Sequence, residues 1–192
     1  LQFEGLSDTR IDASGTLSGA TNPQAAGGTF TIRRFHSSQT DIALFTGQRL
    51  STPQINLPET FDASGTLSGN MANLATNLNI STSSGGLAVN GRFTNLADPA
   101  RATYNANVRT AGLQLGRILR NPQIGALSAN LNLSGKGFTP DAMNTKFKGA
   151  IYSVGFNRYT YRNIKVDGAL AGTAFNVDAD IRDPNIDLTA SA

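Results

Sequence analysis

The sequence predicts an all-β protein that forms one elongated, curled antiparallel sheet with an apolar groove. Three observations support this prediction. Apolar and polar residues alternate along most of the chain, which is the period of a strand with one apolar and one solvated face. Twenty glycines, together with frequent Thr, Asn and Ser, favour strands and turns over helices. The hydrophobic share of 39% is low for a globular chain, so a thick two-sided core is not expected.

The alternation can be followed from strand to strand along the chain. In chain order, the alternating apolar residues are Phe30 and Ile32, Ile42 and Leu44, Phe61, Ala63 and Leu67, Leu78 and Ile80, Leu87, Val89 and Phe93, Tyr104, Ala106 and Val108, Leu127, Ala129, Leu131 and Leu133, Phe147 and Ile151, Ile164, Val166 and Leu170, and Phe175, Val177, Ile181, Ile186 and Leu188. Turn-forming segments such as 81–86 and 183–185 separate the runs. We therefore expect roughly a dozen strands in an antiparallel meander.

One nine-residue motif occurs twice. Segments 11–19 and 61–69 are identical at eight of nine positions, and weaker echoes follow near residues 131 and 166. An offset of this length suits a supersecondary unit of several strands that stacks on copies of itself. We therefore expect residues 1–192 to form a single elongated segment, with quasi-repeats starting near residues 11, 61 and 127, that belongs to a longer protein.

One segment departs from the alternation and predicts a short helix near residues 113–121. Leu115, Ile118 and Leu119 are apolar at helical spacing, and Pro122 ends the pattern. We expect this helix to cap an open end or edge of the sheet.

Candidates for catalytic or metal-binding residues are few. The chain has no cysteine, and its single histidine, His36, has no second histidine or paired carboxylates near it in sequence. Asp178 and Asp180 share the polar face of a strand and lack the glycine-turned loop of a calcium site. We expect no metal, no cofactor and no enzymatic activity. A net charge of +3, carried by scattered arginines, also argues against nucleic acid as a partner.

A continuous apolar face remains as the candidate functional feature. About a dozen strands with the same face apolar must close into a barrel, pack onto a second sheet or curl into a trough. The repeat favours an open-ended trough, in which apolar ligands could lie. The residues expected to line it are Leu78, Ile80, Val89, Phe93, Val108, Leu131, Leu133, Ile151, Val166, Leu170, Phe175, Val177, Ile181, Ile186 and Leu188.

Several motifs resemble those of a known family. Segments 135–138 and 158–168, followed by Phe175 and segment 183–188, resemble in order and spacing the repeats of TamB-like proteins of Bacteroidota, within the wider AsmA-like group. The Leu-Gly-Arg-Ile-Leu segment at 115–119 resembles the short helix of their repeats. The resemblance covers about residues 50–192, and before it only the motif at 11–19 is similar.

The resemblance implies a periplasmic segment of a protein that is anchored in the inner membrane and reaches the outer membrane. Its body would be a β-taco, a curled sheet with a hydrophobic groove. Relatives are associated with phospholipid transport between the two membranes and with outer-membrane protein assembly. The implied partners are phospholipid acyl chains and an outer-membrane barrel of the Omp85 type, which would bind through parts not present in this chain.

Two alternatives remain open from the residues alone. One is a β-solenoid or sandwich segment of a secreted adhesin, in which the apolar face is sealed. The other is a carbohydrate-binding or hydrolase accessory domain, with Tyr159 and Tyr161 as a platform for a sugar ring.

Overall fold

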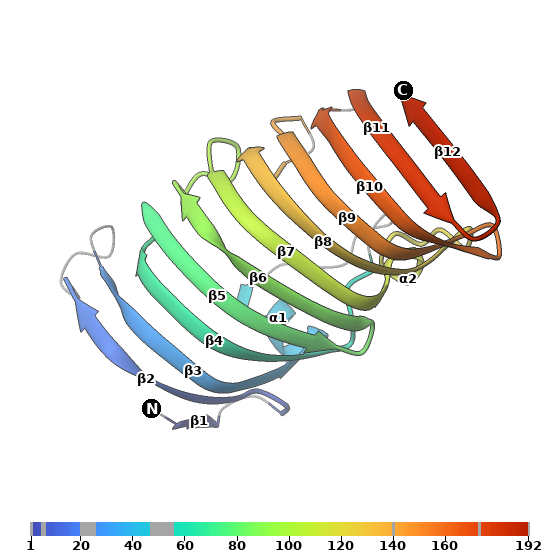
Figure 1. Ribbon diagram of the computed structural model, residues 1–192. Helices are drawn as coiled ribbons and strands as arrows, with labels where there is room; N and C mark the ends of the chain where they lie inside the picture. The colour runs from blue at the N-terminus through green and yellow to red at the C-terminus, as the bar shows by residue number, and fades with distance from the viewer. Residues whose placement is uncertain are drawn as a thin grey trace.

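Twelve strands form one antiparallel sheet in which each strand lies beside its neighbours in sequence (Figure 1). The computed structural model describes residues 2–4, 7–19, 26–46, 56–139, 141–172 and 174–191. The strands are β1 Gln2–Glu4, β2 Arg10–Ser18, β3 Gly27–Ser38, β4 Thr60–Asn70, β5 Asn73–Thr82, β6 Gly85–Thr94, β7 Thr103–Gln114, β8 Ile124–Lys136, β9 Asn144–Phe156, β10 Tyr159–Ala171, β11 Ala174–Asp183 and β12 Ile186–Ser191. The predicted all-β meander is confirmed, and the sheet stays open between its edge strands β1 and β12.

The predicted helix near residues 113–121 is present as α2, which spans Leu115–Ile118. A second helix, α1, spans Gln39–Thr46, so the interpretation of Ile42 and Leu44 as strand residues was wrong. Ser38 caps the start of helix α1: its hydroxyl accepts a hydrogen bond from the backbone N–H of Asp41 over 3.2 Å. The hydroxyl satisfies a donor that would otherwise lack a partner at the first turn, and the chain leaves the sheet there.

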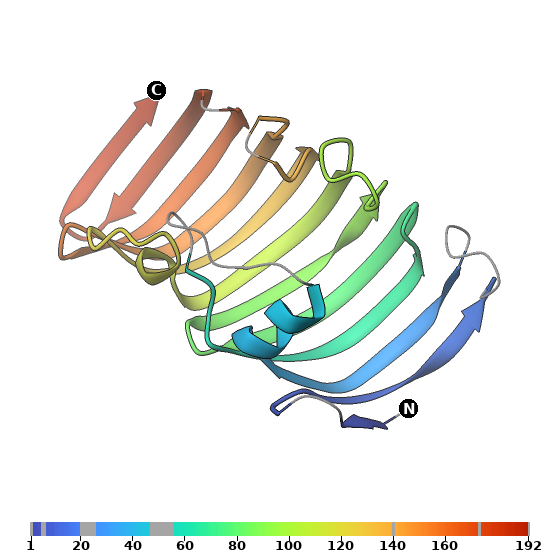
Figure 2. The same cartoon turned by 180° about the vertical axis from the view of Figure 1, so that it is seen from behind.

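The strands bend, and the sheet curls into a trough (Figures 1 and 2). Irregular pairing contributes to the bend. Arg33 and Arg34 on β3 together occupy the place of one residue on each neighbouring strand, and the pairing of β7 with β8 shifts in the same way between Thr110 and Leu113. Such bulges increase the local twist and bend the strand that carries the extra residue.

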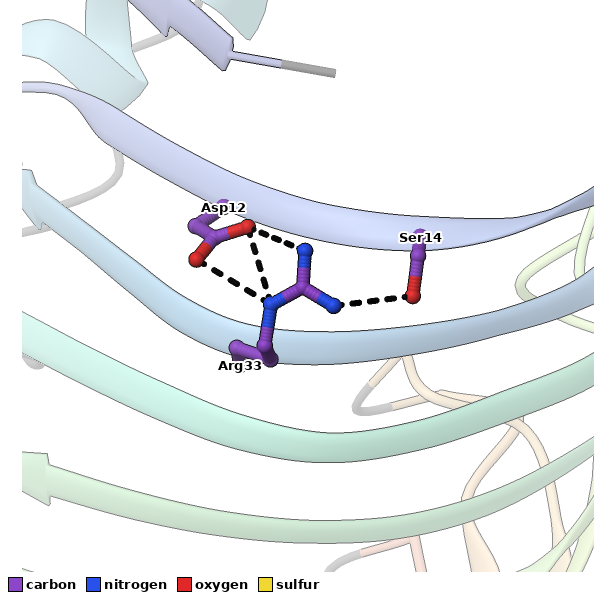
Figure 3. A network of polar contacts seen from close by, with 3 residues as sticks. All are labelled: Asp12, Ser14 and Arg33. Carbon is purple, nitrogen blue, oxygen red and sulfur yellow. Dashed lines mark hydrogen bonds and ion pairs between the residues drawn. The ribbon is translucent and has the colours of Figure 1, made fainter.

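The polar side of the first bulge is held by an ion pair. The Arg33 guanidinium donates to both carboxylate oxygens of Asp12 and to the Ser14 hydroxyl across the β2–β3 boundary (Figure 3). Its shortest contact with Asp12 is 2.7 Å. Hydrogen bonding to Arg33 lowers the pKa of Asp12 and raises that of Arg33. Both side chains are about half exposed, so this pair positions the bulge more than it stabilises the fold.

Helix α1 lies on the inner side of the bend (Figure 2). The Asp41 carboxylate accepts hydrogen bonds from the Asp8 N–H over 2.9 Å and from the Thr9 hydroxyl over 2.8 Å, and Thr9 also contacts Ser37. Burial by itself would raise the pKa of Asp41, but the hydrogen bonds from Asp8 and Thr9 outweigh it and lower the pKa. This buried polar cluster joins α1 to the start of β2 and the end of β3.

The two copies of the nine-residue motif lie on β2 and β4, on either side of β3. Ala13 and Gly65 both pair with Ile32, so the copies run parallel and are displaced by two residues. The described residues between them include β3 and α1, and segments 20–25 and 47–55 lie outside the described residues. In the described residues, one strand and one helix therefore lie between the two copies.

Candidate functional site: an open apolar trough

The inner face of the sheet is built from rows of residues that the strand register places side by side. One row contains Ile80, Leu87, Thr110, Ala129, Ile151, Ile164, Ile181 and Leu188. The next contains Leu78, Val89, Val108, Leu131, Gly149, Val166 and Ala179. A third contains Leu67, Thr76, Gly91, Ala106, Leu133, Phe147, Gly168 and Val177, and a fourth contains Leu74, Phe93, Tyr104, Gly135, Thr145, Leu170 and Phe175. We call this surface the apolar trough.

All fifteen residues that the sequence singled out lie on this face. Fourteen belong to the four rows, and Ile186 precedes Leu188 by two residues on β12, so it points the same way. The structure adds Leu74, Leu87, Tyr104 and Phe147, which the sequence analysis placed on strands or passed over without assigning them to the groove. Polar residues flank Tyr104 and Phe147 on both sides, and this was the signal that could have identified these two.

The trough is open, and its side chains do not form a sealed core. Among the described residues only five hydrophobic side chains are buried, namely Ala102, Ala106, Ala129, Ile164 and Val166. Phe175 is 66% exposed and Leu188 is 48% exposed. Most other trough residues are half-buried, because their neighbours on the curved face shelter them, and among the described residues no second sheet covers them. Exposed apolar surfaces of this kind are typical of interaction sites and ligand-binding grooves.

Glycines make room for aromatic rings on the trough floor. A Cβ added at Gly168 would lie 2.6 Å from Cζ of Phe147, and one added at Gly15 would lie 2.8 Å from Cδ1 of Phe30. The rings therefore lie across the glycines of the adjacent strands. Because each ring occupies the space of a missing side chain, the rings pack against the sheet.

An aromatic cluster stands at one rim of the trough. Phe138, in the β8–β9 connection, stacks on Tyr104 with ring centroids 5.1 Å apart and lies 6.4 Å from the ring of Phe93. Its backbone N–H donates to the carbonyl oxygen of Pro99 over 2.8 Å, which joins two neighbouring connections. Phe138 is 44% exposed, so the cluster presents an apolar surface where the strands turn.

The turn between β11 and β12 is fixed by a buried carboxylate. Asp183 accepts hydrogen bonds from the Tyr159 hydroxyl, from the Arg162 N–H and from the Asn185 N–H, the last two over 3.0 Å. The bond from Tyr159 and the backbone bonds from Asn185 and Arg162 lower the pKa of Asp183, against the opposing effect of burial. Asp183 therefore acts as a scaffold for the turn.

The same network occupies the residues considered for a sugar platform. The ring of Tyr159 meets Tyr161 edge-on at 4.8 Å, and its hydroxyl also accepts from the Asn185 side chain over 2.8 Å. Because its hydroxyl is hydrogen-bonded to Asp183 and Asn185 and its ring packs against Tyr161, Tyr159 is part of the polar cluster that fixes the β11–β12 turn.

The opposite face of the sheet is polar. Asn77, Asn90, Asn107 and Asn132 lie side by side on four successive strands, around a shallow depression of about 560 Å³. The Asn107 side-chain amide donates to Asn130 over 2.7 Å and to Asn132 over 3.1 Å. Farther along, the Lys148 ammonium and the Asp167 carboxylate are 2.7 Å apart. This face is suited to contact with water.

The histidine and acidic residues considered in the sequence analysis do not converge on a metal site in the described part of the chain. No cluster of three or more His, Asp or Glu side chains suited to a metal occurs there. His36 Nδ1 lies 2.8 Å from a carboxylate oxygen of Asp62, a pair on the polar face. Asp178 and Asp180 are on that face as well, on either side of Ala179. No helix within the described ranges is long and apolar enough to span a bilayer.

Comparisons with known proteins give no further assignment. No family model, no curated protein and no solved structure matches the chain.

Proposed function

We propose that this chain is a lipid-carrying segment of a TamB-like envelope protein, in which phospholipid acyl chains lie in the apolar trough. The single observation that carries the proposal is the open inner face, with aligned rows of apolar side chains and only five buried hydrophobic residues in the described ranges. Burying hydrocarbon against such a surface removes apolar area from water on both partners. The opposite face, with its row of asparagines, offers hydrocarbon no comparable apolar surface in the described residues.

The proposed mechanism is passive. Acyl chains slide along the rows while polar head groups stay at the rims in contact with water. Neighbouring strands lie about 4.8 Å apart, so β2–β12 form a trough of about 50 Å. Because each row crosses the strands from β5 to β11 without interruption by a charged side chain, a lipid meets a similar apolar surface at each step along them.

The cellular setting follows from the motif resemblance. By that resemblance the segment works in the periplasm, within a protein anchored in the inner membrane and directed to the outer membrane. The same resemblance connects the protein with outer-membrane protein assembly and with a barrel partner of the Omp85 type. These parts of the proposal rest on the motifs at 135–138, 158–168 and 183–188.

Lipid extraction followed by mass spectrometry tests the proposal. The chain is purified without detergent from bacteria, and its extract is compared with that of a soluble β-rich protein of similar size handled in parallel. We expect phospholipid in molar amounts comparable to protein, displaced by a fluorescent fatty acid. An extract no richer in phospholipid than the control, combined with no binding of the fluorescent fatty acid, would overturn the proposal.

A further inference from the structure

Between β6 and β12, the two rims of the trough differ in charge, whereas nearer the N-terminus the rim that carries α2 also holds Glu59 and the buried Asp41. At the rim that carries α2, the connections 115–123, 157–158 and 184–185 contain Arg117, Arg120 and Arg158 and no acidic residue. We call these three residues the basic rim. At the opposite rim, the connections 95–102 and 137–143 contain two aspartates and one arginine, and that arginine is 3.7 Å from an aspartate of the same loop.

The connections of the basic rim are held together. The backbone N–H of Asn157 donates to the carbonyl oxygen of Gln123 over 2.8 Å, and Phe156 pairs with Ile124. Arg120 and Arg158 therefore project from adjacent turns. All three arginines of the rim are exposed, and in the described ranges none forms an ion pair with an acidic side chain.

The backbone at two of these positions does not favour arginine. The φ angles of Arg120 and Arg158 are 51° and 68°, in the left-handed region where glycine and asparagine are preferred. Asn157, with φ of 49°, shows the residue type that suits this geometry. The fold alone gives no reason for a side chain with a Cβ and a long charged stem at either position, which points to a use for the guanidinium groups.

Exposed apolar side chains stand directly beside the arginines. Leu119 is 42% exposed and precedes Arg120, and Phe156 is 44% exposed and lies two residues before Arg158. Phe156 pairs with Tyr159 at the end of the sheet, where the apolar trough reaches this rim. At this rim, apolar side chains therefore lie next to arginines, as the acyl chains of a lipid lie next to its phosphate.

We propose that the basic rim binds the anionic phosphate head group of a lipid whose acyl chains lie in the trough. This inference rests on the proposed function and adds the class and orientation of the ligand. The planar guanidinium group presents paired N–H donors that match phosphate oxygens. Three exposed cations each contribute a small attraction, and together they favour an anionic over a zwitterionic lipid by about tenfold.

Two short-chain lipids test the inference, used as monomers below their micelle concentrations. Dihexanoyl phosphatidylglycerol has a net negative charge, whereas dihexanoyl phosphatidylcholine has the same acyl chains and no net charge. Binding of each to the whole chain is measured by calorimetry at low and at high salt, with inorganic phosphate as a third ligand. The test variant is R117Q/R120Q/R158Q. The matched control is R92Q/R109Q, which removes two exposed arginines of β6 and β7 on the polar face.

We expect the unmodified chain and the control to bind phosphatidylglycerol about tenfold more tightly than phosphatidylcholine at low salt, with the preference declining as salt screens the rim. The triple variant should bind both lipids with similar affinity, and R117K/R120K/R158K should keep most of the preference. Equal binding of both lipids by the unmodified chain, or an undiminished preference in the triple variant, overturns the basic rim and leaves the trough proposal standing. Binding of neither lipid overturns both. In a last outcome, the triple variant loses phosphate binding but keeps the same lipid preference. The arginines would then form an ion site unrelated to lipid, which also overturns the inference.

Discussion

The ring of Phe147 on β9 lies across Gly168 on β10, so closely that a Cβ at Gly168 would be 2.6 Å from the ring atom Cζ. The same Cβ would be 2.6 Å from the carbonyl oxygen of Asn176 on β11. The aromatic floor of the trough therefore depends on a missing side chain in the neighbouring strand.

Gly168→Ala should lower the free energy of unfolding by about 1–3 kcal/mol, because the ring and the β10–β11 pairing must both shift. Chemical denaturation measures the change. Gly86→Ala is the matched control, since a Cβ there meets only atoms at 3.7 Å, an ordinary contact distance. Equal effects of the two substitutions would show that the ring does not rest on Gly168.

Charge placed in the trough should block acyl binding without unfolding the sheet. Val89 and Asn90 are neighbours on β6 and point to opposite faces. Val89→Asp should reduce binding of a fluorescent fatty acid at least tenfold, because a carboxylate would have to lose water when a chain occupies the row. Asn90→Asp carries the same charge to the polar face and should bind normally.

Circular dichroism and thermal unfolding separate this outcome from misfolding. Because Val89 is only half-buried, its aspartate can reach water when the trough is empty, and the variant should stay folded. If Val89→Asp unfolds the sheet, then the row is a close-packed core. Two further single variants on the exposed edge strand β12 repeat the comparison. Leu188→Asp places the charge in the trough and Thr189→Asp places it on the polar face, at a position where the sheet should best tolerate a substitution.

Stability should fall in acid. Hydrogen bonds hold the pKa of Asp183 and that of Asp41 below the ordinary value of 3.8, so the folded chain binds these protons less readily than the unfolded chain does. Their contribution is present above the unfolded pKa and is lost as the pH falls through the lower folded values. Unfolding free energy measured between pH 6 and pH 2 should decline most steeply below about pH 4.

Asp183→Asn removes one source of that decline. It should destabilise the chain at neutral pH, where the Tyr159 and backbone N–H bonds lose a charged acceptor, and the loss relative to the unmodified chain should shrink in acid. Asp141→Asn, at an exposed loop position, should leave the pH profile unchanged. A constant difference between Asp183→Asn and the parent at every pH would contradict this assignment.

Arg120→Asn should stabilise the chain by about 0.5–1 kcal/mol, because asparagine tolerates a positive φ better than arginine does. The midpoint temperature of thermal unfolding should rise by a few degrees. Arg117→Asn, at a helical position in α2, should give no gain, since asparagine is a poorer helix former than arginine. A loss of stability in Arg120→Asn would mean that the Arg120 side chain supports the fold.

The positions of the strands, and the residues that share the apolar face of the sheet, could be predicted because side chains alternate between the two faces of a strand. Runs such as Phe175–Ile181 fix which residues share a face even before pairing partners are known. Helix α1 was missed because Ile42 and Leu44 continue the alternation, and the capping signal formed by Ser38 and Asp41 was overlooked. That signal is local and was available from the sequence.

Other features depend on three-dimensional pairing and could not be predicted. The alternation in β6–β8 is the same whether the apolar face is sealed by a second sheet or left open, so the exposure of the trough required the structure. Likewise, the left-handed backbone at Arg120 and Arg158 is set by how adjacent turns meet, and arginine gives no indication of it. The difference between the two rims became visible only when the ends of the strands were assigned.

The sequential strand order also determines how the chain can fold. Each strand pairs only with the strand before it and the strand after it in sequence, so no distant segment has to be found before a hairpin forms. Folding can therefore start at any hairpin and spread outward in both directions, and opening should begin at the edges and move inward one strand at a time. The length of such a sheet is not limited by closure, and strands can be added or removed in pairs with the interior unchanged.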